Sequence, residues 1–426
     1  MNLSNWLRKL RRMFSYLLPV TTLRTEYESP ATLSDRSMRQ FEEARRLYRD
    51  GTLDEALEQL SGMAFLSSLP DNFLHRLLEE AAGTRQDGTL RSLAGELSPA
   101  LLPAGQWLQL YQACFRSGLL QTAGILRRHA RQSAVATASS EKATPEQVEC
   151  AFRALVDAGR LERARRELDR LEELVRMPQN VRTQYRVYLH LSDGNLEEAV
   201  SLAETLPGYH VPFRRYLEGR SVAVAGPAAS EEQMGPLIDS FDVVVRMNYG
   251  RRSGAGDPAV YGSRTDVSYY NRGFLDYLKR EEAWDVLDEL DHALFRCRHD
   301  DLSAHLQDRE NVQNPMARLF YFSGFPNLGQ LSIADLLLHR PARLKIFHMN
   351  FYYDSRRHHD NYFLAHDHRN ENHLRSLAVH DCLSQLGTMR NFRNSGLIEA
   401  DPACGRVLDM DEEDYLSGLE TFYAGR

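Results

Sequence analysis

Three short apolar runs between residues 222 and 267 constrain the fold of this chain more than any other feature. The first is Val222–Ala225 and ends at Gly226; the second is Val243–Val245 and leads into Arg246-Met247-Asn248; the third begins at Val267. Short apolar runs that end in turn residues are typical of strands buried inside a sheet. We therefore expect an open α/β sheet, in which polar groups at the ends of parallel strands bind nucleotides.

The stretch from residue 222 to residue 271 resembles the large sialylmotif of eukaryotic-type sialyltransferases (glycosyltransferase family 29). The shared features are the glycine turn, an Ile-Asp-Ser core that leads to Arg-Met-Asn over residues 238–248, and a Gly-Ser-Arg-Thr segment over residues 262–265. The resemblance implies that this region binds the nucleotide of a CMP-activated sugar donor. The residues it assigns to that nucleotide are Gly226, Asn248, Ser263 and Arg264.

A second segment resembles the small sialylmotif, in which a turn holds the donor nucleotide. We predict a helix over the charged residues 274–298. After it we predict a strand at Phe320–Ser323, a helix at Gln330–His339 and a strand at Leu344–Met349, with a glycine-containing turn after the first strand. The turn ends in Asn327 and Gly329, and the resemblance assigns both to the nucleotide. An asparagine can cap the helix there, and the free N–H groups of the helix N-terminus suit a phosphate or ribose.

Two histidine-containing segments resemble the remaining sialylmotifs. His358 and His359 lie in a segment similar to the third motif, which is near the donor phosphate in that family. His380 opens a segment similar to the very small motif, His-x4-Glu, with Gln385 at the glutamate position. The resemblance implies that His380 is the general base. A neutral imidazole suits removal of the acceptor proton at neutral pH, and donors such as His358, His359 and Tyr353 suit the departing phosphate.

The same region contains further histidines and aspartates, so a metal site must be weighed. No HExxH pair and no Cys/His ligand set is present. The lone Asp-x-Asp, Asp409–Asp411, belongs to an acidic run typical of a helix start. Because CMP leaves without a pyrophosphate to neutralise, we expect metal-independent transfer, with no metal site and no cofactor beyond the donor, CMP-sialic acid or CMP-Kdo.

Residues 31–217 are predicted to form a helical repeat domain. Four segments share a Gly-x-Leu-x-x-Ala core, and their glycines lie 67, 41 and 35 residues apart, near multiples of the tetratricopeptide period of about 34. Such repeats stack because one unit alone cannot bury its apolar stripe. Two roles stay open: a platform for an acceptor or protein partner, and a brace for the catalytic domain. The glycine of each segment is predicted to form the tight turn between two helices; the four are Gly51, Gly118, Gly159 and Gly194. The Ser/Ala/Thr-rich stretch Gln132–Thr144 is expected to be a loop.

The N-terminal segment, residues 1–30, predicts a basic amphipathic helix followed by a linker. Apolar residues recur at helical spacing within residues 1–20, and residues 1–24 contain five basic residues and no acid. Such a helix either lies on a membrane surface or docks on the protein itself. The net charge of −7 gives no global sign of nucleic-acid binding. Five scattered cysteines without CxxC spacing favour a reducing compartment. We therefore expect a cytoplasmic protein, at the inner membrane face if the helix lies on a membrane. The resemblance favours a bacterial relative, because the segment similar to the large motif lacks the cysteine that opens this motif in the lumenal sialyltransferases.

The sequence thus predicts a Rossmann-like α/β catalytic domain over residues 218–426, preceded by the α-helical repeat domain. The resemblance implies the sialyltransferase type of this fold, a variant of the glycosyltransferase A fold. It also implies a glycosyltransferase that moves a ulosonic acid, sialic acid or Kdo, to a hydroxyl of a surface glycan or glycolipid. The second interpretation is a non-catalytic scaffold with a decayed sialyltransferase-like domain. An NAD enzyme is excluded because Gly226 does not begin a G-x-G-x-x-G motif.

Overall fold

A computed structural model of the chain describes residues 43–44, 46–47, 80, 87–250, 256–297, 302, 304–354, 358–359, 362, 374 and 377–423. The predicted amphipathic segment at residues 1–20, its linker and the repeat at Gly51 lie outside the described residues. The same holds for His366, His368 and His373, three of the further histidines that were weighed for a metal site.

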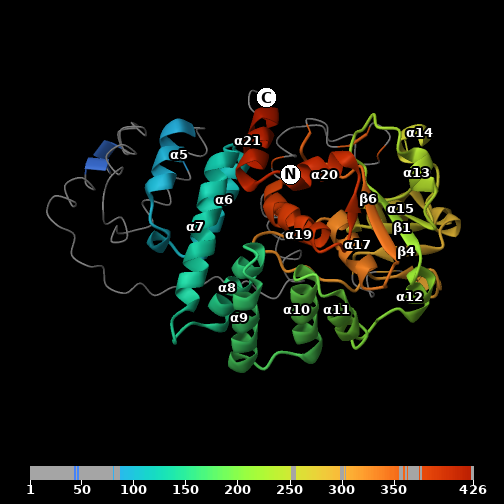
Figure 1. The fold of residues 1–426 in the computed structure, drawn as a ribbon, viewed down its shortest axis with the longest axis horizontal. Coiled ribbons are helices and arrows are strands. Elements are labelled where there is room, and N and C mark those ends of the chain that lie inside the picture. The colour runs from blue at the N-terminus through green and yellow to red at the C-terminus, as the bar shows by residue number, and fades with distance from the viewer. Residues whose placement is uncertain are drawn as a thin grey trace.

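A seven-stranded sheet lies at the centre of the C-terminal half (Figure 1). The strand order is β5-β4-β3-β2-β1-β6-β7, and every neighbouring pair is parallel. The chain builds outward from β1 to β5 and then returns to the other side of β1, so the topology switches between β1 and β6. The strands are β1 Ser221–Ala225, β2 Val243–Met247, β3 Val267–Tyr270, β4 His292–Phe295, β5 Val312–Gln313, β6 Arg343–Phe347 and β7 Glu399–Ala400.

The central strands are buried on both faces, which is why their sequence is apolar without alternation. Val222 and Val224 of β1 belong to a large core, whereas Ala223 and Ala225 belong to a smaller one with Ile238. The α/β prediction and the strands expected from the three apolar runs are confirmed. The helices of this half are α13 Gly235–Asp239, α14 Pro258–Tyr261, α15 Arg272–Glu281, α16 Ala304–Gln307, α17 Leu328–Leu337, α19 Cys382–Asn394, α20 Pro402–Asp409 and α21 Glu412–Tyr423, with a 3-10 turn η3 at Trp284–Glu289.

The N-terminal half consists of helices that pack in sequence. Glycines with positive φ separate α6 from α7, α8 from α9 and α10 from α11, at Gly118, Gly159 and Gly194. Glycine adopts this backbone conformation without steric cost, and these three predicted turns are confirmed. The helices are α5 Asp87–Glu96, α6 Ala104–Arg116, α7 Leu120–Ala138, α8 Pro145–Asp157, α9 Leu161–Leu174, α10 Gln179–Ser192, α11 Leu196–Ala203 and α12 Val211–Leu217, with η2 at Pro99–Leu101. Within the described residues, no helix has the length and apolarity needed to cross a membrane.

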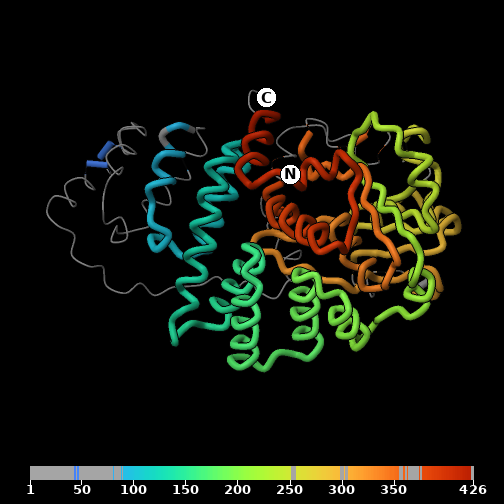
Figure 2. Tube along the Cα trace, in the orientation of Figure 1, coloured from blue at the N-terminus to red at the C-terminus, as the bar shows by residue number. Residues whose placement is uncertain are grey.

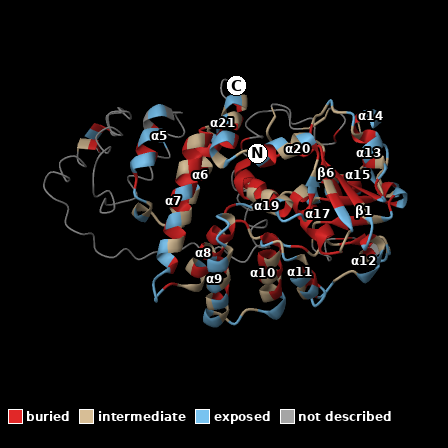
Figure 3. Cartoon of the chain, viewed as in Figure 1, coloured by how far each residue is buried: buried red, intermediate tan, exposed pale blue. Residues whose placement is uncertain are grey.

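The two halves share one core. The chain returns after β7, and α21 then packs against α7, while α19 packs against α8 and α10 (Figure 2). One buried apolar cluster includes Leu126 of α7, Met389 of α19 and Ile346 of β6 (Figure 3). The predicted boundary near residue 218 falls between α12 and β1, and the buried core continues across it.

Three local predictions were wrong, each for a tertiary reason. The loop predicted at Gln132–Thr144 begins as helix, because α7 continues to Ala138 with Ala134 and Ala138 buried on one side. The strand predicted at Phe320–Ser323 does not form; Phe320 stacks on Tyr185 of α10 at 4.1 Å between ring centroids, so the segment packs on helices. The helix expected over residues 274–298 ends at Glu281, and β4 pairs with β3 instead.

Candidate functional site

A cavity of about 180 Å³ opens where the topology of the sheet switches. Open α/β sheets bind ligands at the carboxyl ends of their strands at such a switch point. Residues that follow β1, β2, β3, β4 and β6 line it, together with the first turn of α17. The lining residues are Pro227, Ala228, Met247, Asn248, Asn271, Arg296, Asn327, Leu328, Gly329, Gln330, His348, Met349, Asn350, Phe351, Tyr352, His358, Tyr362 and His380.

The polar lining of the cavity favours an anionic or nucleotide-like ligand. Among the described residues that line it, none is acidic. Amides, histidines and one arginine supply the polar groups instead, and amides can both donate and accept hydrogen bonds. In the part of the chain that the structure describes, no group of three or more His, Cys, Asp or Glu could hold a metal ion.

Arg296 is the cationic group of this lining and was missed by sequence reasoning. It follows β4, donates from Nη1 to the carbonyl oxygen of Pro326 at 2.6 Å, and lies over the ring of Phe325. Burial lowers its pKa, and among the described residues no carboxylate forms an ion pair with it. A half-buried guanidinium without a counter-charge is costly unless an anion binds it. A basic residue directly after the apolar run Ala293–Phe295 was the available signal.

Asn248 lies at the end of β2 with its side chain at the cavity wall. Its backbone has φ 54°, a left-handed conformation that asparagine tolerates better than most residues. Its Nδ2 donates to the hydroxyl of Tyr362 at 3.0 Å, and its Oδ1 accepts from the backbone N–H of Asn271 at 3.1 Å. The residue thereby joins β2 to the end of β3 and to the Tyr362 segment.

The predicted turn before α17 also lines the cavity. Asn327 caps the helix, with Oδ1 accepting from the backbone N–H of Gln330 at 3.1 Å, as expected. Its Nδ2 donates to the hydroxyl of Tyr352 at 3.1 Å. A side chain at Gly329 would come within 3.3 Å of the Met349 Cε, so glycine keeps this first turn open to the cavity.

His380 lies at the cavity with its tautomer set by a backbone contact. Its Nδ1 is 3.1 Å from the carbonyl oxygen of Phe325. Because a carbonyl can only accept, Nδ1 carries the proton and Nε2 is the basic nitrogen. The Nε2 amide of Gln385 donates to the carbonyl oxygen of His380 at 2.6 Å. The residue at the family's glutamate position therefore holds the backbone of the histidine.

Of the other two histidines predicted for the site, one lines the cavity and one does not. His358 lines the cavity and its ring lies 4.5 Å from that of Tyr362. His359 does not line it; its backbone N–H donates to the carbonyl oxygen of Pro227 at 3.0 Å, and its ring lies beside Tyr261. Sequence reasoning missed His348, which follows β6 and lines the cavity. Burial lowers the pKa of His348.

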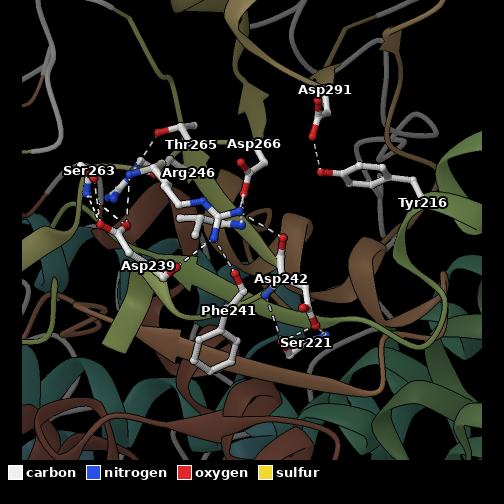
Figure 4. A network of polar contacts seen from close by, with 12 residues as sticks. Tyr216, Ser221, Asp239, Phe241, Asp242, Arg246, Ser263, Thr265, Asp266 and Asp291 are labelled. Carbon is white, nitrogen blue, oxygen red and sulfur yellow. Dashed lines mark hydrogen bonds and ion pairs between the residues drawn. The ribbon is translucent and has the colours of Figure 1, made fainter. Parts of the chain in front are cut away.

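Ser263 and Arg264 do not line the cavity but contact Asp239. Figure 4 shows Ser263 beside Asp239 in this polar network. The Asp239 carboxylate accepts from the backbone N–H of Ser263 at 2.8 Å and from its hydroxyl at 2.9 Å. Arg264 donates to the carbonyl oxygens of Asp239 and Phe241 and forms an ion pair with Asp266 at 2.9 Å. The Ile-Asp-Ser and Gly-Ser-Arg-Thr segments thus hold α13, β2 and β3 together. Asp239 and Asp266 are likewise outside the cavity lining.

Two more predicted residues lie just outside the cavity. Gly226 donates to the carbonyl oxygen of Phe347 at 2.7 Å, and a side chain there would come within 2.4 Å of the His348 carbonyl oxygen. Glycine at this position lets β1 and β6 approach and places the next two residues in the lining. Tyr353 packs against Tyr415 and Phe422, and the neighbouring Tyr352 lines the cavity instead.

The structure therefore brings together five of the predicted residues. Asn248, Asn327, Gly329, His358 and His380 come from four separate parts of the C-terminal half and line one cavity. In comparisons with known proteins, neither a protein-family model nor a curated protein matches the chain.

Proposed function

We propose that the chain is a glycosyltransferase that moves a ulosonic acid from a CMP-activated donor to a hydroxyl of a surface glycan or glycolipid. The observation that carries this proposal is the lining of the cavity at the β1–β6 switch point. It combines amides, histidines and Arg296, and the described lining contains no acid. A CMP-ulosonate carries a phosphodiester and a carboxylate, so it supplies the anions that such a lining lacks.

The groups divide naturally between the parts of this donor. Asn248, Asn327 and the first turn of α17 suit the nucleotide, because amides and free helical N–H groups bind ribose and phosphate. Arg296 suits the carboxylate or the phosphate. The cavity volume is below the about 300–1,000 Å³ of ordinary small-molecule pockets, so it encloses part of the donor and leaves the acceptor outside.

In the proposed reaction, His380 accepts the proton of the acceptor hydroxyl on Nε2. The acceptor oxygen forms a bond to the anomeric carbon, and the bond from that carbon to the CMP oxygen breaks. CMP leaves with the bonding electron pair as an anion, close to Arg296 and His358. Positively charged and N–H donor groups at that point stabilise the developing charge.

The test is to incubate the protein separately with CMP-sialic acid and CMP-Kdo in the presence of EDTA and to measure CMP release. Thermal melts with CMP, UDP and NAD are the binding control, because ligand at about 100 times its dissociation constant adds about 2.7 kcal/mol of stability. Release from either donor, with stabilisation by CMP, supports the proposal. Stabilisation by CMP without turnover indicates the scaffold interpretation, and stabilisation by UDP or NAD alone contradicts the donor assignment.

A further inference from the structure

A buried ionic cluster from the helical half holds the residue next to His380. Asp381 follows His380 directly, is completely buried and caps the N-terminus of α19. Its Oδ2 accepts from the Nη2 of Arg127 on α7 at 2.9 Å, and its Oδ1 accepts from the hydroxyl of Tyr111 on α6 at 3.1 Å. Two helices from the N-terminal half, α6 and α7, therefore hydrogen-bond to the residue that directly follows the proposed base.

Arg127 is itself held by contacts with α8 as well as with the start of α19. It donates two hydrogen bonds to Asp157, the last residue of α8, at 2.7 and 2.6 Å. Burial alone would raise the pKa of Asp157, but the charges of Arg127 and Arg131 hold it below its ordinary value. The hydroxyl of Ser384, in the first turn of α19, lies 2.8 Å from Arg127 Nη2. Paired and hydrogen-bonded charges of this kind have little freedom to move, because a broken contact leaves a charge buried.

The backbone at this position is also unusual. Asp381 has φ 45°, so the chain changes direction between the helical residues 377–380 and α19. A non-glycine residue in this conformation persists only when its surroundings enforce it. The backbone N–H of Phe325 donates to the carbonyl oxygen of Val379 at 3.2 Å, and the Phe325 carbonyl meets the His380 ring. The cluster on one side and the Phe325 loop on the other thus determine where the imidazole lies.

We infer that Tyr111 and Arg127 are positioning residues for His380, so that the helical half forms part of the catalytic apparatus. The expected effect of these residues on the rate rests on the proposed function. Their expected effect on the position of the His380 ring rests on the geometry alone. In this view the helical half supports the catalytic domain, as one of the two predicted roles has it, and it does so through its hydrogen bonds to the Asp381 carboxylate.

The experiment compares two matched variants of the full chain. Tyr111→Phe removes a buried hydroxyl that donates to Asp381. Tyr185→Phe is the control: it removes a hydroxyl of α10 that donates to Glu149 of α8, a contact inside the helical half. The measurements are thermal stability, the NMR titration of the His380 ring (assigned by its loss in His380→Gln), and the kinetics of CMP release. Arg127→Lys is a second variant, which keeps the charge but cannot reproduce the forked contacts.

Both tyrosine variants are expected to lose similar stability, but only Tyr111→Phe should shift the His380 titration. It should also lower kcat about tenfold with KM nearly unchanged, since small displacements of a catalytic group cost up to about 100-fold. If neither Tyr111→Phe nor folded Arg127→Lys changes the His380 titration, the cluster is only structural and the inference fails. If wild-type protein releases no CMP, the proposed function fails, and the NMR comparison still decides the positioning.

Discussion

Gln385 donates a hydrogen bond from its Nε2 amide to the backbone carbonyl oxygen of His380, over 2.6 Å. The very small sialylmotif, which this segment resembles, has glutamate at this position, and a carboxylate there could not donate. Gln385 is buried, so the loss of this bond would leave the carbonyl oxygen of His380 facing another acceptor. Glutamine in place of the motif's glutamate therefore suits this chain, because its amide can donate to the His380 carbonyl oxygen.

Introducing the glutamate of that motif should be harmful. We expect Gln385→Glu to lower the free energy of unfolding by about 1–3 kcal/mol, the cost of leaving a buried polar group unsatisfied. CMP release should fall as well, because the backbone of His380 loses its support. Urea unfolding at neutral pH and the release assay measure the two effects. An unaltered or faster enzyme would contradict the role assigned to the amide.

Arg296 offers a direct test of the anion site. Arg296→Met keeps an apolar stem and removes the charge, so CMP affinity should fall about 10- to 100-fold, since a charge-assisted hydrogen bond contributes about 1.5–3 kcal/mol. The stability of the unliganded protein should hardly fall, because an uncompensated half-buried charge is also removed. Calorimetric titration with CMP measures the affinity.

The matched control for this experiment is Arg390→Met. Arg390 is also half-buried, donates to the carbonyl oxygens of Leu408 and Met410, and has a pKa lowered by burial. It does not line the cavity, so its replacement should leave CMP affinity unchanged. Equal losses in both variants would mean that Arg296 acts through the fold and not through the ligand.

The parts of the fold that could be predicted are those whose sequence signal is local. β1, β2 and β3 begin in or contain apolar runs between turn residues, β6 contains Leu344, Ile346 and Phe347, and the glycine turns have a conformation that favours glycine. The asparagine cap before α17 was also predictable, because capping depends on residues three positions apart. β4 was missed, since Ala293–Phe295 is a short run between charged residues, and Arg296 was missed with it.

The candidate site could be predicted only in part. A motif shows which residues lie near one another, but not which of them face a ligand. Ser263 and Arg264 belong to the motif, yet their contacts are with Asp239 and its neighbours. The contact between Arg127 and Asp381 joins residues 254 positions apart, and no local sequence pattern predicts it. Long-range contacts of this kind depend on how the two halves pack.

His380 can be tested by a substitution that keeps its size and polarity. His380→Gln should bind CMP normally and lose transfer by about 10²–10⁴-fold, because it cannot accept the acceptor proton. The wild-type rate should fall at acid pH, because a protonated imidazole cannot accept the proton of the acceptor hydroxyl. His190→Gln, which replaces a half-buried histidine of α10, is the control and should retain the rate. Normal turnover by His380→Gln would require another base.

The N-terminal segment is tested by deletion of residues 1–20. We expect transfer to a water-soluble acceptor to persist and co-sedimentation with anionic liposomes to decrease, in a manner that high salt also reproduces. Four of the five basic residues before position 25 lie within the deleted segment and supply the attraction. Unfolding of the truncated protein would instead show that the segment docks on the protein itself.

Asp335 predicts a pH dependence of stability that is separate from catalysis. It is completely buried, accepts from the hydroxyl of Tyr269 at 2.8 Å and from two backbone N–H groups, and burial raises its pKa to about 6. Because its folded-state pKa lies above its ordinary value, the folded protein binds the proton more tightly than the unfolded chain does. The carboxyl group therefore contributes stability at low pH and loses that contribution as the pH rises through about 6.

Asp335→Asn should remove this dependence, since the amide oxygen can still accept from the backbone N–H groups of Met316 and Ala317. Relative to the variant, the wild type should lose about 3 kcal/mol of unfolding free energy between about pH 4 and pH 7, at 1.36 kcal/mol for each pKa unit. Urea unfolding of both proteins across this range measures the difference. Each curve also contains the titration of the other carboxylates, but subtraction leaves only the Asp335 contribution. A constant difference between the two proteins would show that Asp335 stays ionised throughout, held by Tyr269 and the backbone N–H groups.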